Sequence, residues 1–386
     1  MEKVRFGIVG LGSMGTSHAD RVWKGDIPGL ELVAVCDINP ERMEHAKKAY
    51  PGVATFDNAE DLYKSGLCDL VIVATPHYDH PRLVISALEH DLHVISEKPA
   101  GVYTKQVLEM NEAAKKSNKL FGIMFNQRTN PMYQKLREMI QRGDLGHIKR
   151  INWIITTWYR SQAYHDSATW RSNWKLEGGG TLINQNPHQL DLWQWMFGMP
   201  SKIRSFVSFG KYYDIEVEDD VTAYMEYENG TTGVYITSTG EAPGVNRLEV
   251  TGDMGVVVIE NGKMTFRRNY VSEREFNKTN TKSFGLPENW TCEIPVAPGN
   301  GEQHNGILKS MTNAILKGEE LLAPGLDGIN GLTISNAMHY STWIDDWADV
   351  KNFPHDDFYA KLQEKIATSK PKKVVEAKAQ NLEGTY

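Results

Sequence analysis

Apolar residues gather in short, nearly continuous runs along the first third of the chain. These runs are Val4–Val9, Glu31–Asp37, Asp69–Ala74, His93–Ser96 and Leu120–Phe125. Runs of this kind are typical of strands that are buried on both faces of a parallel sheet. Segments with helical spacing separate them, namely Asn39–Tyr50, Pro81–Glu89 and Thr104–Ser117. The alternation predicts a doubly wound parallel sheet over residues 1–127.

Long strands dominate the pattern after residue 127. A helix over 131–142 is followed by extended runs at 148–158, 220–239 and 246–268. The Asn229-Gly230 pair predicts a type I′ hairpin, and Gly252-Asp253 and Asn261-Gly262 predict further turns of a meander. We therefore expect a second α/β domain over residues 128–386, with a large, mostly antiparallel open sheet.

Three later segments complete this picture. Helical spacing returns at 303–316 and 330–347. Residues 269–300 are polar and punctuated by proline and glycine, which fits either an excursion near a binding site or an oligomer contact. A lysine-rich tail, expected to be loosely held, follows Lys370.

Composition narrows the classes of partner. The 386 residues include 42 basic and 49 acidic side chains, spread along the chain for a formal net charge of −7, which suits neither nucleic acid nor an anionic membrane. The cysteines Cys36, Cys68 and Cys292 form no CxxC pair, which argues for a reducing compartment and against a disulfide framework or a zinc site. The sequence shows no signal-peptide pattern and no apolar run of 18 residues. A cytoplasmic protein without a metal is expected.

A glycine-rich loop carries the first candidate chemistry. Gly10, Gly12 and Gly15 stand between a strand and a helix, in the spacing that permits a tight turn, a close approach by a pyrophosphate and close helix packing. The helix start at Ser13 and Met14 offers N–H groups and positive dipole to the phosphates. Asp37 closes the next strand, where a carboxylate can accept both ribose hydroxyls and repel a 2′-phosphate, so NAD is the expected cofactor. Arg42 is interpreted as a solvated helix face.

Two further loops follow strands of the same sheet. The first contains Thr75, Pro76 and His80, for which a plain turn and a cofactor contact are both open; the neighbouring His77 and Tyr78 fit a plain turn better. The second contains Glu97 and Lys98, just before Pro99. A solvated surface pair is the ordinary interpretation of these two charges. A lysine at this edge could instead bind and polarise a substrate hydroxyl.

These motifs, together with "FNQR" and "GGGTLINQNPHQLD", resemble the Gfo/Idh/MocA family of nicotinamide-dependent sugar and cyclitol oxidoreductases over essentially the whole chain. The resemblance implies a Rossmann domain, a C-terminal α/β domain whose open sheet forms homo-oligomers such as dimers or tetramers, and a substrate site between them. It implies catalytic roles for Lys98 and His188. It also implies cofactor contacts from Asn126, Gln127, Arg128, Trp170 and Arg171, and from Glu97.

The stretch around His188 departs from the common family pattern, in which an aspartate stands four residues before the histidine. This chain has Asn184, which can orient an imidazole and bind a sugar hydroxyl but cannot stabilise an imidazolium by charge. His188 should then be a weaker proton acceptor, and Lys98 would take a larger share. Asp191 is interpreted as a helix-surface or capping residue. The helix begins either at Pro187, with Asn186 as its cap, or near Thr181 with a kink.

Several polar and aromatic residues are weaker substrate candidates. Besides Lys98, Asn184 and His188, the set comprises Arg128, Tyr159, His165, Asp166 and His304. A sugar can dock on an aromatic face, which is the reason for including Tyr159. Solvated loop or helix positions explain the others equally well.

The sequence thus predicts an NAD(H)-dependent oxidoreductase that acts on a secondary hydroxyl, at C3, of a pyranose sugar or glycoside. Within the family, the chain is most similar to the branch of levoglucosan dehydrogenase and the enzymes that oxidise glucosides at C3. A cyclitol dehydrogenase is the nearest alternative. An NAD-dependent glycosidase and a catalytically silent NAD sensor are alternatives of other classes.

Overall fold

A six-stranded parallel sheet forms the N-terminal part of the protein, whose computed structural model describes residues 2–370. Its strand order is β3-β2-β1-β4-β5-β6, the doubly wound order of a Rossmann domain. The strands are β1 (Val4–Val9), β2 (Leu30–Cys36), β3 (Ala54–Phe56), β4 (Leu70–Val73), β5 (His93–Ser96) and β6 (Phe121–Ile123). The five predicted strands are confirmed. The pattern missed β3 because its three residues are only partly buried.

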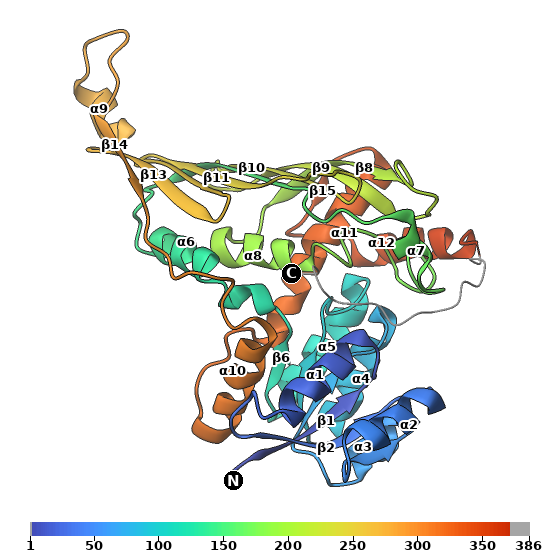
Figure 1. The fold of residues 1–386 in the computed structure, drawn as a ribbon. Coiled ribbons are helices and arrows are strands. Elements are labelled where there is room, and N and C mark those ends of the chain that lie inside the picture. The colour runs from blue at the N-terminus through green and yellow to red at the C-terminus, as the bar shows by residue number, and fades with distance from the viewer. Residues whose placement is uncertain (1, 371–386) are drawn as a thin grey trace.

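Helices connect these strands and leave the carboxyl ends of the strands at one edge (Figure 1). They are α1 (Ser13–Trp23), α2 (Pro40–Ala49), α3 (Ala59–Lys64), α4 (His80–Glu89) and α5 (Thr104–Lys116), with the short 3-10 turn η1 (His77–Asp79) before α4. Asn39 caps α2, because its side-chain oxygen accepts a hydrogen bond from the Glu41 amide at 2.8 Å. The loops that follow β1, β2, β4 and β5 therefore meet at this edge.

A second, nine-stranded sheet follows, in the order β14-β13-β12-β11-β7-β10-β9-β8-β15. The strands are β7 (Ile148–Ile155), β8 (Lys202–Phe209), β9 (Glu218–Glu226), β10 (Thr232–Ser238), β11 (Asn246–Gly252), β12 (Gly255–Glu260), β13 (Lys263–Asn269), β14 (Asn289–Glu293) and β15 (Ala348–Asp349). Strands β7 and β10 pair in parallel and the other neighbours are antiparallel. The predicted α/β fold with a mostly antiparallel second sheet is confirmed.

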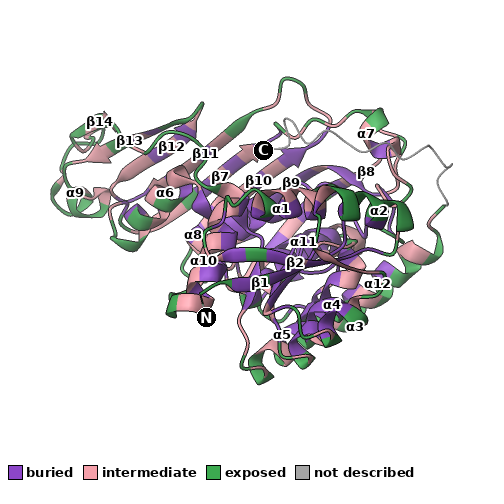
Figure 2. Cartoon of the chain, turned by 60° about the horizontal axis from the view of Figure 1, so that its bottom comes forward, coloured by how far each residue is buried: buried purple, intermediate pink, exposed green. Residues whose placement is uncertain are grey.

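One face of this sheet is covered by helices that lie between it and the Rossmann domain (Figure 1). They are α6 (Pro131–Gln141), α8 (Pro187–Phe197), α11 (Gly328–Ile344) and α12 (His355–Ala367), with the short α7 (Gln162–Asp166) to one side. The fully buried Trp153, Trp193 and Tyr235 pack edge to face in this layer. Buried residues gather where sheet and helices meet (Figure 2). The oligomer contact expected through this sheet stays a prediction.

The hairpin turns correct one detail of the sequence analysis. At Asn229-Gly230 only the glycine has a positive φ, 83°, and the Gly230 amide donates to the Tyr227 carbonyl. A type I′ turn needs positive φ at both central residues, so the type I′ prediction is wrong there. Asn261 and Gly262, with φ of 53° and 72°, form that turn between β12 and β13 instead.

Two later segments take different positions. Residues 269–300 include α9 (Glu273–Thr279) and β14, and their tip projects from the sheet edge away from the Rossmann domain (Figure 1). This tip is not an excursion near the Rossmann edge; an oligomer contact stays open. Helix α10 (Gln303–Lys317) instead returns to the first domain, where Ile307, Leu308 and Met311 join its hydrophobic core. Packing therefore crosses the division predicted at residues 127 and 128. The lysine-rich tail after Lys370 lies outside the described residues.

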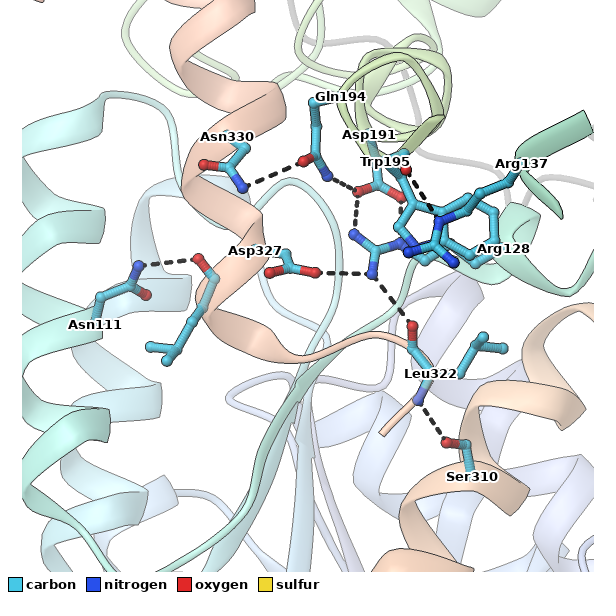
Figure 3. Close-up of polar contacts among 11 residues, drawn as sticks. Asn111, Arg128, Arg137, Asp191, Gln194, Trp195, Ser310, Leu322, Asp327 and Asn330 are labelled. Carbon is cyan, nitrogen blue, oxygen red and sulfur yellow. Dashed lines mark hydrogen bonds and ion pairs between the residues drawn. The ribbon is translucent and has the colours of Figure 1, made fainter. Parts of the chain in front are cut away.

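A buried ion-pair network joins the two domains at Arg128 (Figure 3). Arg128 lies in the 3-10 turn η2 (Asn126–Thr129), just after β6, and is 1% exposed. Its Nε and Nη2 donate to both carboxylate oxygens of Asp191 on α8, at 2.8 and 2.6 Å. Its Nη1 donates to Asp327 at 2.8 Å and to the Leu322 carbonyl at 3.2 Å, in and near the turn η3 (Gly325–Asp327) that leads into α11. One guanidinium thus fixes α8 and α11 against the Rossmann domain.

This arrangement corrects one sequence-based interpretation. Asp191 is buried and ion-paired, so its interpretation as a helix-surface or capping residue is wrong. The guanidinium of Arg128 is occupied by its protein partners, and a contact of Arg128 with cofactor or substrate stays a prediction. Neither partner could be identified from the sequence, because the two residues are 63 positions apart.

Replacing Arg128 by methionine should lower the free energy of unfolding by about 3–5 kcal/mol, because Asp191 would remain buried without a counter-charge. The double change Arg128→Met with Asp191→Leu should recover most of that loss. Arg82→Met serves as the control, because the Arg82 side chain in its surface pair with Asp79 is 68% exposed and its loss should cost about 0–1 kcal/mol. Urea unfolding monitored by fluorescence measures all three. A loss in Arg128→Met no larger than that of the control would contradict this account.

Candidate active site

The glycine loop has the shape that a bound pyrophosphate requires. Gly10 has a φ of 98°, and a Cβ there would lie 2.5 Å from the Ala74 carbonyl oxygen. A Cβ on Gly15 would lie 1.8 Å from the Gly10 oxygen, so α1 packs directly on the loop. A Cβ on Gly12, in contrast, would meet nothing within 4 Å. The loop thus leaves open space in front of the start of α1, at Ser13 and Met14, and fits a dinucleotide phosphate.

Asp37 lies directly after β2, beside this loop. Its carboxylate accepts hydrogen bonds from the Leu11 amide at 2.6 Å and from the Asn39 amide at 2.8 Å. Arg42 also contacts it, with Nη1 3.2 Å from Oδ2, although the arginine side chain is half exposed. Arg42 is therefore an ion-pair partner of Asp37 as well as a helix-surface residue. A carboxylate with remaining lone pairs at this strand end fits the two ribose hydroxyls of NAD.

The loop after β4 contains residues at the sheet edge and a buried histidine. Thr75 and Pro76 lie at the sheet edge, where a cofactor contact stays a prediction. His80 is buried, and its ring nitrogens contact the Pro99 oxygen at 2.7 Å and the Thr75 oxygen at 2.8 Å. Both ring nitrogens of His80 thus face backbone oxygens, and a cofactor contact from this residue stays a prediction. His77 contacts the Glu177 carbonyl oxygen at 3.1 Å and holds this loop to the second domain.

Lys98 crosses from the Rossmann edge to the second domain. Its Nζ donates to the backbone oxygen of Asn184 at 2.9 Å, so it is not the solvated surface pair of the ordinary interpretation. Burial lowers the pKa of the Lys98 amine, and the negative charge of Glu97 opposes that shift. Glu97 itself lies 2.7 Å from the buried His18 on α1. Burial raises the pKa of Glu97, but the hydrogen bond and charge of His18 outweigh it and bring that pKa to about 2.

His188 stands in the first turn of α8. The helix begins at Pro187 with Asn186 as its N-terminal cap residue, which decides between the two starts left open by the sequence. His188 is 8% exposed, and its Nδ1 is buried without a hydrogen-bond partner among residues 2–370. Burial holds the pKa of His188 well below its usual range, and the nearby Lys98 lowers it further. The imidazole is therefore neutral at pH 7 and can accept a proton or a hydrogen bond.

Asn184 lies before α8, in the turn that follows the three glycines, and not on the helix that carries His188. Its Nδ2 donates to Glu177 at 2.5 Å and to the Tyr164 hydroxyl at 3.4 Å. The backbone of this turn is held by β9: the Glu218 side chain accepts from the Leu182 amide at 2.9 Å. The sequence analysis missed Glu177 and Glu218. A carboxylate directly before three glycines was the one available signal for Glu177.

The remaining predicted residues spread around this centre. Trp170 and Arg171 pack together, and the Arg171 Nη1 donates to the Tyr164 hydroxyl at 2.6 Å. His304 lies beside His18, with ring centroids 5.5 Å apart, and burial lowers the pKa of His304 to about 3. Asn126 and Gln127 both donate to the Gln303 side chain, at 2.6 and 3.2 Å. For all of these, a ligand contact stays a prediction.

The three weaker substrate candidates lie near α7. Tyr159 is half exposed before this helix. His165 is buried with its Nδ1 2.7 Å from the Ser172 hydroxyl, and Asp166 accepts from Gln162 at 3.1 Å. Within residues 2–370, no cluster of three metal-binding side chains is found and no helix is long and apolar enough to cross a membrane.

Two family models match the chain. The model described as the oxidoreductase family with an NAD-binding Rossmann fold matches residues 4–125. The GFO/IDH/MocA C-terminal domain model matches residues 133–258.

Individual relatives are sugar and cyclitol dehydrogenases. The chain is 25% identical to myo-inositol 2-dehydrogenase of Thermotoga maritima, over 68% of this chain and 77% of the relative. It is 29% identical to D-glucoside 3-dehydrogenase of Escherichia coli, over 59% of this chain and 68% of the relative. The solved structure of levoglucosan dehydrogenase in complex with NADH has the same fold, with a TM-score of 0.76 and 19% identity over 90% of this chain and 99% of that one.

The glycine loop generates a paired prediction. Gly12→Ala should fold normally, because its Cβ meets open space, and should bind NADH about tenfold or more weakly, because that space is where the phosphates lie. Gly15→Ala should instead destabilise the fold by about 1–3 kcal/mol, because its Cβ meets the Gly10 backbone. NADH fluorescence titration and thermal unfolding separate the two effects. Unchanged NADH affinity in Gly12→Ala would exclude this loop as the phosphate site.

Proposed function

Because the chain belongs to the Gfo/Idh/MocA family of NAD-dependent oxidoreductases, we propose that it oxidises a secondary hydroxyl of a pyranose sugar or glycoside, at C3. The observation that carries this proposal is that Lys98 and His188 lie close enough at the domain boundary for the Lys98 charge to lower the pKa of His188. Lys98 comes from the edge of the Rossmann sheet and is partly buried, and His188 comes from the start of α8 and is buried. A polarising cation beside a neutral proton acceptor is the pair that alcohol oxidation needs.

The chain's own residues handle the proton and the developing charge. When bound, NAD supplies the hydride acceptor, C4 of its nicotinamide ring. Lys98 donates a hydrogen bond to the hydroxyl oxygen and stabilises the negative charge that develops there. His188 accepts the hydroxyl proton. Its imidazolium is disfavoured by burial and by Lys98, and a lowered Lys98 pKa makes the amine a better participant in proton exchange. When Lys98 is an ammonium, His188 takes the proton; in the fraction of molecules in which Lys98 is a neutral amine, Lys98 can take it instead.

Support for the C3 position comes from the relatives, one of which is a D-glucoside 3-dehydrogenase. A second candidate substrate class, the cyclitols, is favoured by the myo-inositol 2-dehydrogenase relative, whose match extends over more of this chain. Both substrates present a six-membered ring that carries secondary hydroxyls, so the same Lys98 and His188 serve either.

A panel of methyl glucosides, levoglucosan and inositols with added NAD tests the proposal, with NADH absorbance as the signal and NMR to locate the new carbonyl. NADH together with a 3-keto glycoside supports it. Oxidation of inositols alone favours the cyclitol candidate. Release of the aglycone without net NADH favours an NAD-dependent glycosidase, and NADH binding with no turnover on any member favours a sensor.

Replacement of His188 by alanine should lower kcat about 100- to 10,000-fold while leaving NADH affinity unchanged, because only the proton acceptor is removed. Lys98→Met should lower kcat by a comparable factor. Lys105→Met is the matched control, because the Lys105 amine forms a surface ion pair with Asp356 and lies outside the site. Steady-state kinetics and NADH titration measure the three variants. Full turnover by a folded His188→Ala protein would disprove the assigned role.

A further inference from the structure

Glu177 is a buried carboxyl group to which the mechanism above gives no role. It is 2% exposed and stands directly before the three glycines of the turn that leads to α8. One of its oxygens accepts from the Ser172 amide, and the other accepts from the Asn184 Nδ2 at 2.5 Å. Both oxygens therefore face donors, an arrangement that only an acceptor group can satisfy completely.

This contact determines which way the Asn184 amide points. Its Nδ2 is turned to Glu177 and Tyr164, so its Oδ1 is left to accept a hydrogen bond from elsewhere. The backbone oxygen of the same residue accepts from Lys98 Nζ at 2.9 Å. Glu177 thus acts on the residue that contacts Lys98, and it does so through a part-buried hydrogen bond from the Asn184 amide to its carboxylate.

The surroundings of Glu177 leave its charge sensitive to pH near neutrality. Burial raises the pKa of Glu177 to about 7, opposed by Arg171 and by the two hydrogen bonds and reinforced by Glu218 on β9. Lys98 from the Rossmann edge also faces it, with Arg160 near that amine. Tyr164 on α7 bonds to the same Asn184 amide, and His77 contacts the Glu177 carbonyl oxygen.

We propose that Glu177 is a positioning residue of the dehydrogenase: its carboxylate orients Asn184 so that Oδ1 accepts a hydrogen bond from the reacting sugar, and it places a negative charge behind the amide. This inference rests on the proposed function. It also answers the question raised by the missing aspartate. The carboxylate that Asn184 lacks is supplied by Glu177, on the segment that precedes Asn184 in the chain.

A double-mutant cycle tests the pair. In Glu177→Gln the oxygen of the new side-chain amide must accept from the Ser172 amide, so the NH2 group of the new side chain faces Asn184. The Asn184 side-chain amide then has to turn around, because two NH2 groups cannot bond to one another. We expect kcat/KM to fall about 10- to 100-fold. Glu177→Gln combined with Asn184→Asp exchanges the amide and the carboxylate and keeps every donor opposite an acceptor. This double variant should recover at least tenfold of the loss, whereas Asn184→Asp alone, with two carboxyls in contact, should not.

The pH profile separates this role from a merely structural one. In the wild type, kcat/KM should fall as the pH drops through about 7, where Glu177 takes up a proton. That limb should be absent in Glu177→Gln. Wild-type kinetics and profile in Glu177→Gln, or a folded double variant with no recovery, would overturn the proposal.

A readout without turnover keeps the two proposals distinct. The side-chain amide NMR signal of Asn184, assigned by its loss in Asn184→Asp, should shift as the pH passes through about 7 and should stay fixed in Glu177→Gln. If the wild type oxidises no sugar or cyclitol but the signal shifts, the proposed function fails and the Glu177–Asn184 coupling stands. If sugar is oxidised but the signal does not respond, the role of Glu177 is refuted alone.

Discussion

The paired hydrogen bonds between Arg128 and Asp191 are the constraint on which the candidate site depends. Arg128 follows the last strand of the Rossmann sheet, and Asp191 lies one turn along α8 from His188. Two ions that are each 1% exposed stabilise one another only in a fixed geometry, since separation would leave both charges buried and uncompensated. The register of α8 against the Rossmann edge is therefore well defined. Because His188 stands one turn before Asp191 on the same helix, this pair also fixes the position of His188.

Burial of a few titratable groups determines the chemistry of the site. Burial pushes the pKa values of Lys98 and His188 downward and that of Glu177 upward, so each shift brings the neutral form closer to working pH. A site of this kind can move protons without large changes in net charge. The Lys98 contact with Asn184 then couples the two domains through the same residue that Glu177 orients.

The sequence predicted what depends on local pattern and missed what depends on distant partners. Buried parallel strands, the glycine turn, Asp37 and the position of Lys98 follow from runs and spacing over a few residues, and the structure confirms these placements. The Arg128–Asp191 pair joins residues far apart in the chain, so each residue alone resembled a ligand contact or a helix-surface group. The contact of His80 with the Pro99 oxygen was likewise not predictable, because Pro99 lies in the loop after the next strand. The Asn229-Gly230 turn shows that even a strong local signal can be wrong. The loop there is one residue longer than the two-residue loop of a type I′ turn.

The central claim is that the chain removes hydride from C3 of a glycoside, and isotope transfer tests it directly. A methyl glucoside carrying deuterium only at C3 is incubated with the protein and NAD, and the NADH is examined by mass spectrometry. The account predicts NADH that carries the deuterium, with a 3-keto glycoside beside it. NADH formed without deuterium would place the oxidation at another carbon and contradict the account.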